Sequence, residues 1–194
     1  GAGAQARTQL EAACTARPIE TVFLYTRNAE KAHALASEMK SKGFARQEFR
    51  VAQTPKETIE HADIICTATT SSTPVFDDKD VKPGTHISAV GSYTPEMQEV
   101  PAETLQRAKI FVDSRSASLE EAGDLIQPIR TGLFDETHIC GELGEVILGH
   151  HPGRESAEEI TYFKSVGIAV QDAMAAQVAL TNARKMNIGT EVDF

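Results

Sequence analysis

The sequence predicts an α/β fold in which a doubly wound, mostly parallel sheet is flanked by helices. Short apolar runs rich in strand-forming residues alternate along the chain with helix-forming stretches, which is the pattern of βαβ units. The chain also opens on a glycine-rich turn, Gly1 to Ala6, that leads directly into a predicted helix. Together these observations predict a Rossmann-like fold with a long helix at its C-terminus.

Six strands are predicted from short apolar runs that contain many β-branched and aromatic residues. Turn residues such as Pro83-Gly84, ahead of the fourth run, separate these runs from their neighbours. The predicted strands cover residues 21–26, 48–52, 62–69, 85–91, 109–114 and 160–166.

Helices are predicted where apolar residues recur at helical spacing and capping residues mark the ends. Asn28 can cap a helix that ends at Gly43, and Thr54-Pro55 opens a short helix that ends at His61. Residues 115–150 are predicted to form two helices with a turn near Thr131-Gly132. The other predicted helices cover residues 4–17, 101–108 and 168–186.

The opening turn fits G-x-G-x-x-G/A, the pattern that lets a backbone approach a dinucleotide pyrophosphate at a helix N-terminus. Such a turn normally follows a buried strand, and here the sequence begins on the turn itself. Either the motif is accidental, or the chain begins within a larger protein and lacks the first strand of its nucleotide fold.

The residues that would read the cofactor ribose are Thr26, Arg27 and Asn28, about 20 residues after the turn, at the end of a predicted strand. No Asp or Glu stands there to accept the 2′-hydroxyl group of NAD(H). Arg27 instead offers charge-assisted hydrogen bonds to a 2′-phosphate. The sequence therefore favours NADP(H), with NAD(H) as the alternative; Arg27 could also be a solvated charge at a strand end.

The composition disfavours several classes of partner. The formal net charge of −9 disfavours a nucleic-acid or anionic-membrane surface, and no apolar run is long enough to span a bilayer. Cys14, Cys66 and Cys140 are scattered, and the adjacent pair His150-His151 lacks the spacing of metal ligands. We therefore predict no metal site, no disulfide framework and a reducing, cytoplasmic setting.

Five motifs occur in order along the whole chain: "GAGAQARTQLEA", "SAVGSYTPEMQEVP", "VDSRSASLEEAGDL", "GELGEVILG" and "ITYFKSVGIAVQDAMAA". Together they resemble the ornithine cyclodeaminase/μ-crystallin family of NAD(P)-dependent enzymes. The resemblance implies a homodimer whose substrate-binding and dimerisation region precedes the glycine turn. It also implies a dinucleotide-binding domain at residues 1–160 and a C-terminal strand and helix at 161–194 that pack back toward that region.

The resemblance assigns cofactor contacts to the glycine turn and to the ends of the predicted strands, where ligands bind in parallel sheets. The turn would face the pyrophosphate, and two later segments would border the nicotinamide from opposite sides. The implied contacts are Gly1, Gly3, Ala4, Gln5, Ala6, Thr67, Ala68, Thr69, Val90, Gly91, Ser165, Val166 and Gly167. Each of these residues could instead serve packing, a turn or a helix cap.

One position departs from part of the family. Tyr93 stands where cyclodeaminases and archaeal alanine dehydrogenases carry an acid/base Asp. A phenol keeps its proton at neutral pH, so it can donate that proton but cannot replace a carboxylate base. The "GSYTPEM" segment instead resembles reductases of small cyclic imino acids, of the Δ1-pyrroline-2-carboxylate and ketimine type. Tyr93 is accordingly the candidate catalytic residue, with a packing role as its alternative.

The predicted activity is therefore NAD(P)H-dependent reduction of a small cyclic imino acid. Ornithine cyclodeaminase, alanine dehydrogenase and a non-catalytic NADP(H)-binding relative are the alternatives. The family's Arg and Lys for the substrate carboxylate belong to the preceding region, so we expect this portion alone to be inactive.

The remaining ionisable residues are predicted to be structural. Asp113, Glu120, Glu121 and Asp124 favour helix capping and a solvated face over acid/base chemistry. Lys164 is interpreted as either a salt-bridge partner or a phosphate contact.

Overall fold

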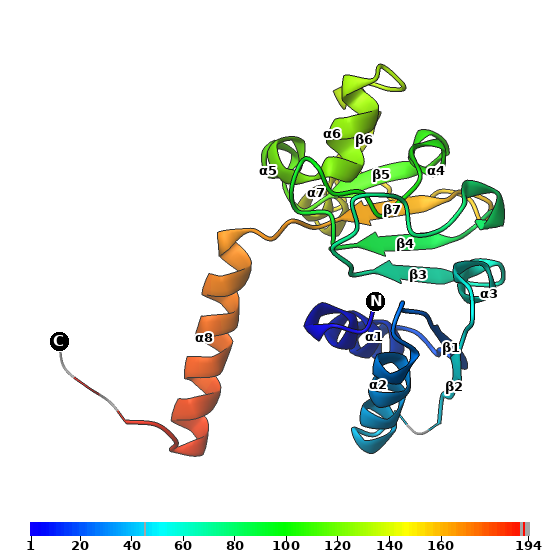
Figure 1. Cartoon of the computed structure of the whole chain (residues 1–194). Helices are drawn as coiled ribbons and strands as arrows, with labels where there is room; N and C mark the ends of the chain where they lie inside the picture. The colour runs from blue at the N-terminus through cyan, green and yellow to red at the C-terminus, as the bar shows by residue number, and fades with distance from the viewer. Residues whose placement is uncertain (45, 191, 193–194) are drawn as a thin grey trace.

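The computed structural model describes residues 1–44, 46–190 and 192 of the chain, and its strands form two parallel sheets (Figure 1). The smaller sheet pairs β1 (Thr21–Leu24) with β2 (Glu48–Val51). The larger sheet has the order β3-β4-β7-β5-β6. Its strands are β3 (Ile64–Thr67), β4 (His86–Ala89), β5 (Lys109–Val112), β6 (Ile139–Glu142) and β7 (Thr161–Lys164). The predicted α/β class is confirmed.

Helices connect these strands in the alternation that the sequence predicts (Figure 1). Asn28 and Thr54 accept hydrogen bonds from the amides of Lys31 and Glu57, as expected of N-caps. The α-helices are α1 (Ala4–Ala16), α2 (Ala29–Ser41), α3 (Pro55–Ile59), α4 (Ala102–Arg107), α5 (Arg115–Glu121), α6 (Gly123–Arg130), α7 (Leu143–Ile147) and α8 (Ala169–Met186). Two 3₁₀ turns are η1 (Asp78–Asp80) and η2 (Glu136–His138).

The prediction of two helices over residues 115–150 is wrong in its second half. Helices α5 and α6 precede the turn at Thr131-Gly132, but β6 and the short α7 follow it. Strand β6 pairs with β5 at the edge of the larger sheet and buries alternate residues, Ile139 and Gly141. This pairing with a distant strand overrides the local helical spacing, which continues only over α7.

Two clusters of apolar side chains form the core. Ile87, Ile110, Val112 and Tyr162 are fully buried between the strands of the larger sheet and their helices. The smaller sheet forms its own cluster against α2, and α1 packs on that cluster through partly buried residues such as Leu10. Helix α1 therefore belongs to the smaller sheet, but it also contacts β3 of the larger one.

Gly1 lies between the carboxyl ends of the two sheets. Its nitrogen donates to the carbonyl oxygen of Tyr25, just after β1, at 2.9 Å. On its other side, a Cβ atom at Gly1 would lie 2.6 Å from the carbonyl oxygen of Ala68, just after β3. The glycine turn thus spans the separation between β1 and β3, which do not pair with each other among the described residues. The strand expected ahead of the turn stays a prediction.

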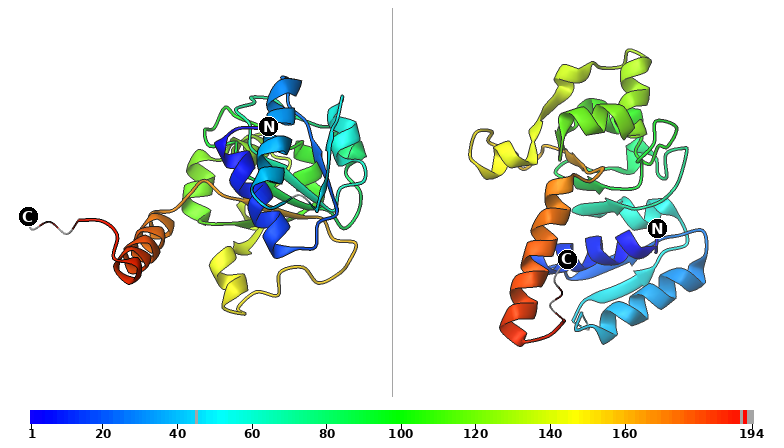
Figure 2. Two further views of the ribbon diagram at one scale, coloured as in Figure 1. Left: turned by 90° about the horizontal axis from the view of Figure 1, so that it is seen from below. Right: turned by 90° about the vertical axis from the view of Figure 1, so that its left-hand side faces the viewer.

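Helix α8 stands apart from both sheets (Figures 1 and 2). None of its residues is buried, and Val170, Met174 and Val178 expose more than half of their surface along one face. No described helix, α8 included, combines the length and apolar character that a membrane span requires. Strand β7, which precedes α8, lies at the centre of the larger sheet. The predicted division into residues 1–160 and 161–194 stays a prediction.

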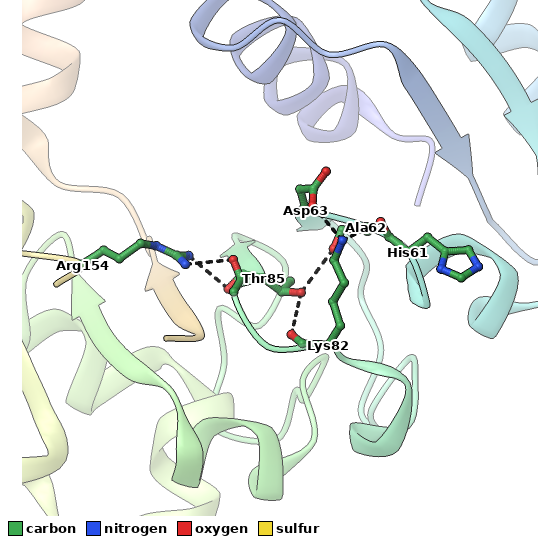
Figure 3. A network of polar contacts seen from close by, with 7 residues as sticks. His61, Ala62, Asp63, Lys82, Thr85 and Arg154 are labelled. Atoms are coloured by element: carbon green, nitrogen blue, oxygen red, sulfur yellow. Dashed lines mark hydrogen bonds and ion pairs between the residues drawn. The ribbon is translucent and has the colours of Figure 1, made fainter. Parts of the chain in front are cut away.

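A polar network joins the amino ends of β3, β4 and β7 (Figure 3). Thr85 donates its hydroxyl to the carbonyl oxygens of Ala62 and Lys82. The guanidinium of Arg154 donates to the carbonyl oxygen of Thr85, and Lys82 donates to the carboxylate of Asp63 at 2.7 Å. This edge of the sheet is opposite the edge where ligands bind in parallel sheets, so we assign the network to stability.

Candidate dinucleotide site

An open cleft of about 340 Å³ lies between the start of α1 and the carboxyl ends of the larger sheet. It brings together nine of the predicted site residues from four separate segments. The cleft is lined by Gly3, Ala4, Gln5, Ala68, Thr69, Thr70, Val90, Gly91, Tyr93 and Val166. Thr70 is the one lining residue that the sequence did not single out.

Helix α1 begins at this cleft with unsatisfied backbone donors. Gly3 is the N-cap and supplies no side-chain hydrogen bond, and the first turn carries no acidic residue. Arg7, near that end, is held by Glu38 of α2 at 2.6 Å. Free amides and the positive end of a helix dipole favour a bound anion, so this end of the cleft fits a pyrophosphate.

Gly91 lies at the floor of the cleft in very close packing. A Cβ atom there would lie 2.3 Å from the carbonyl oxygen of Thr69 and 2.4 Å from the Glu99 carboxyl carbon. Glu99 is fully buried and accepts hydrogen bonds from the amides of Thr69 and Gly91, at 2.5 and 2.8 Å. Only a residue without a side chain fits between these groups, so a glycine at 91 lets the loop after β4 pack directly against Thr69 and Glu99.

The loop that carries Tyr93 is held by α6. The Ser92 hydroxyl accepts from the amide of Asp124 and donates to the carbonyl oxygen of Met97, both at 2.9 Å. Gln127 donates its side-chain amide to the carbonyl oxygens of Pro95 and Met97. Tyr93 itself is 47% exposed and lines the cleft. Tyr93 therefore lines an open site from a loop that α6 holds in place.

A second carboxylate, Asp113 at the end of β5, holds the loop that follows β7. One of its oxygens accepts from the Ser165 hydroxyl at 2.7 Å and from the amides of Val166 and Gly167 at 3.0 and 2.8 Å. Ser165 and Gly167, which the family resemblance assigns to the nicotinamide side, are thus bound to Asp113 rather than lining the cleft. Val166 alone reaches the cleft.

A cluster of buried charges lies below these loops. Asp124 accepts from the amides of Glu99 and Val100, and its other oxygen accepts from the Tyr162 hydroxyl at 3.0 Å. Burial raises the pKa of Asp124 to about 6, against the opposing attraction of Lys164. Burial likewise lowers the pKa of Lys164, although the carboxylates of Asp124, Glu99 and Asp113 counter this effect. Lys164 is the only buried cation among the described residues.

The other predicted site residues lie outside the cleft lining. Gly1 is in the turn that leads to it, and Ala6 packs against the core of the smaller sheet. Thr67 is buried in β3, so its side chain faces the interior. Thr26, Arg27 and Asn28 follow β1 at the same carboxyl edge, where Arg27 is exposed and Asn28 caps α2.

The predictions for the buried ionisable residues are wrong in part. Asp113 and Asp124 are buried rather than on a solvated face, whereas Glu120 and Glu121 are exposed as expected. Lys164 is neither a salt-bridge partner nor exposed to a phosphate: its Nζ is buried without a hydrogen-bond partner among the described residues. The sequence offered one signal for Asp113, its position directly after a predicted strand. Loops at the carboxyl edge of a parallel sheet form its ligand-binding site, so a polar residue there is a candidate for that site.

A larger open cavity, of about 510 Å³, lies beside the N-terminus of α3. It contains none of the predicted site residues, and its lining includes the carboxylates of Asp77 and Asp80. A site for an anionic dinucleotide is disfavoured by these negative charges. The smaller cleft, with the helix N-terminus and the glycine turn, is therefore the candidate site.

Comparisons with known proteins agree with this assignment of the fold. The chain is 46% identical, over 195 aligned positions, to a Δ(1)-pyrroline-2-carboxylate reductase of Bacillus cereus. The match covers 100% of this chain and 59% of that protein. The chain thus spans less than two thirds of the length of this relative.

Two solved structures match nearly the whole chain. The Thermococcus litoralis Δ(1)-pyrroline-2-carboxylate reductase, in complex with NADH and L-proline, matches with a TM-score of 0.94 and 41% identity. That match covers 99% of this chain and 59% of the other. An archaeal alanine dehydrogenase dimer with bound NAD matches with a TM-score of 0.91 and 35% identity, over 100% of this chain and 59% of the other. Because the family model also matches residues 1–187, the chain belongs to the ornithine cyclodeaminase/mu-crystallin family.

Proposed function

We propose that this chain forms the cofactor-binding portion of an NAD(P)H-dependent reductase, which is called the natural protein below. Its substrates are small cyclic imino acids, of the Δ1-pyrroline-2-carboxylate or ketimine type. The observation that carries this proposal is the cleft itself, where Tyr93 lies beside the glycine turn and the strand ends. The similarity to two Δ(1)-pyrroline-2-carboxylate reductases, one of them bound to NADH and L-proline, supports the substrate class.

The residues of the cleft fit a nicotinamide dinucleotide. The open first turn of α1, with Gly3, Ala4 and Gln5, would hold the pyrophosphate. Val90, Gly91 and Val166, which also line the cleft, would bind the nicotinamide end. When bound, this cofactor supplies a hydride to the imine carbon.

Reduction of an imine also requires one proton at the nitrogen. Tyr93 lines the cleft and carries a phenol hydroxyl, which fits a proton donor, and its loop is held by α6. The carboxylate base that cyclodeamination uses has no equivalent at this position, since residue 93 is Tyr. This difference favours imine reduction over ornithine cyclodeamination.

The cofactor preference proposed for the protein is NADP(H). Arg27 is exposed two residues after Tyr25, whose carbonyl oxygen accepts a hydrogen bond from the nitrogen of Gly1 in the glycine turn. Residues 25–28 contain no carboxylate that could accept a hydrogen bond from a ribose hydroxyl. The two nicotinamide-bound relatives carry NADH and NAD, so NAD(H) remains the alternative.

The assembly proposed for the natural protein is a homodimer in the cytoplasm, as the family resemblance implies. The archaeal alanine dehydrogenase relative is a dimer. We further propose that the exposed apolar face of α8, at Val170, Met174 and Val178, is covered by the dimerisation and substrate-binding region of that assembly.

The experiment is a comparison of substrates with the natural protein, expressed from its complete reading frame. Initial rates are measured with Δ1-pyrroline-2-carboxylate, with L-ornithine, and with pyruvate plus ammonia, each with the appropriate cofactor. We expect the cyclic imine to be turned over fastest. Faster turnover of ornithine, or of pyruvate with ammonia, would assign the protein to one of the two alternative activities.

A further inference from the structure

Three irregular loops form most of the cleft, and each follows a strand of the larger sheet. The segments after β3, β4 and β7 supply seven of its ten lining residues, from Ala68 to Val166. Such loops have no regular pairing for their amides, so some other acceptor must hold them in one conformation.

That acceptor is a buried carboxylate in each case. Glu99 binds the amides of Thr69 and Gly91, and so joins the loop after β3 to the loop after β4. Asp113 binds the Ser165 hydroxyl and the amides of Val166 and Gly167, and so holds the loop after β7. Neither carboxylate lines the cleft, so both act through the backbone of other residues.

We propose that Glu99 and Asp113 are positioning residues, which hold the three loops in the geometry that binds the dinucleotide; this inference rests on the proposed function. A carboxylate is required at both places, because each of its oxygens accepts from an N–H group. Both Glu99 oxygens accept from amides, and the second Asp113 oxygen accepts from the amide of Ser114 at 2.8 Å. A side-chain amide in either orientation would turn an NH₂ group toward at least one of these donors.

Lys164 completes this arrangement as the buried counter-charge. It is the last residue of β7 and lies in register with Ala89 of β4 and with Val112 of β5, the residue before Asp113. Buried carboxylates with no cation near them would be costly, and Lys164 attracts Asp124 as well as Glu99 and Asp113. The loops are thereby ordered before a ligand arrives, which lowers the entropic cost of binding.

The test uses Glu99→Gln and Asp113→Asn in the natural protein, with Glu120→Gln as the control, since Glu120 is an exposed acid in α5. The dissociation constant of NADH is measured by fluorescence, the melting temperature without cofactor by calorimetry, and amide hydrogen exchange by NMR. We expect the dissociation constant to rise about tenfold or more in each variant, and exchange to accelerate at the amides that lose their acceptor. The control should match the wild type.

The wild-type protein provides a measurement that does not depend on whether a variant folds. Its amides at Thr69, Gly91, Val166 and Gly167 should exchange slowly even without cofactor, and fast exchange there would overturn the proposal. An NADH dissociation constant within about twofold of wild type in both folded variants would also overturn it, even if their melting temperatures fall. Failure of the wild-type protein to bind NADH or NADPH would instead contradict the proposed function, which separates the two outcomes.

Discussion

Gly91 and Glu99 are packed so closely that a Cβ atom at residue 91 would lie 2.4 Å from the carboxyl carbon of Glu99. The same atom would lie 2.3 Å from the carbonyl oxygen of Thr69. No ordinary side-chain contact is this short, so any larger residue must displace the buried carboxylate or the backbone. The floor of the cleft therefore depends on a glycine at this position.

Gly91→Ala is expected to disturb both folding and cofactor binding. Overpacking of a tight site costs about 1–3 kcal/mol of unfolding free energy. The displaced loop should also weaken NADH binding, measured by fluorescence titration. Gly144→Ala is the matched control, because a Cβ atom there meets nothing within 4 Å and the residue lies in helix α7. Equal stability and affinity of Gly91→Ala and wild type would contradict this packing.

Tyr93→Phe is expected to slow imine reduction without changing cofactor affinity. The substitution removes the hydroxyl and keeps the ring, and loss of a positioned proton donor costs about 10²–10⁴ in rate. The measurement is the rate with Δ1-pyrroline-2-carboxylate at saturating NADPH in the natural protein. A rate within about twofold of wild type, far short of the range for a lost acid, would assign Tyr93 to packing.

Arg27→Asp is expected to shift the cofactor preference from NADPH toward NADH. The substitution replaces attraction with repulsion at the proposed 2′-phosphate, and one charge-assisted hydrogen bond contributes about 1.5–3 kcal/mol. The ratio of the two dissociation constants should therefore change roughly tenfold or more. Arg17→Asp, at the far end of α1, makes the same charge change and should leave the ratio unaltered. An unchanged ratio of the two dissociation constants in Arg27→Asp would mean that another residue contacts the 2′ position of the ribose.

Asp124→Asn is expected to change the pH dependence of stability. Burial raises the pKa of Asp124 to about 6 from 3.8, so the folded protein binds this proton more tightly than the unfolded chain. The resulting stabilisation is present at about pH 4 and is lost as the pH rises through about 6. A shift of this size corresponds to about 3 kcal/mol. Asn stays neutral throughout, and it can still accept from both amides and donate to the Tyr162 oxygen.

The measurement is the free energy of unfolding of wild type and Asp124→Asn between pH 4 and pH 7. The value for the variant should rise relative to wild type as the pH increases, because only the wild type must ionise a buried carboxylate. Asp172→Asn, an exposed position in α8, should show a constant difference from wild type. A constant difference for Asp124→Asn as well would contradict the burial effect on its pKa.

The fold and the cleft were largely predictable from the sequence because their signals are local. Apolar runs predicted the strands from β1 to β5 and β7, and the glycine turn predicted the start of α1 at the cleft. Strand β6 was missed because its four residues are a strand only through pairing with β5. The buried roles of Glu99, Asp113 and Lys164 were missed for a similar reason. The position of Asp113 after a strand indicates the ligand-binding edge of the sheet, but no adjacent residue reveals that its carboxylate will meet amides up to 54 positions away.

The most direct test of the proposed function is a single-turnover experiment in which the natural protein, saturated with NADPH or NADH, is mixed with Δ1-pyrroline-2-carboxylate. Cofactor oxidation is followed optically, and proline is measured in the quenched sample. We expect the bound cofactor to be oxidised only when the imine is present, with one proline formed for each cofactor consumed. Tight binding of a cofactor that stays reduced in the presence of the imine would contradict the proposal, and would identify the protein as a non-catalytic dinucleotide-binding member of the family.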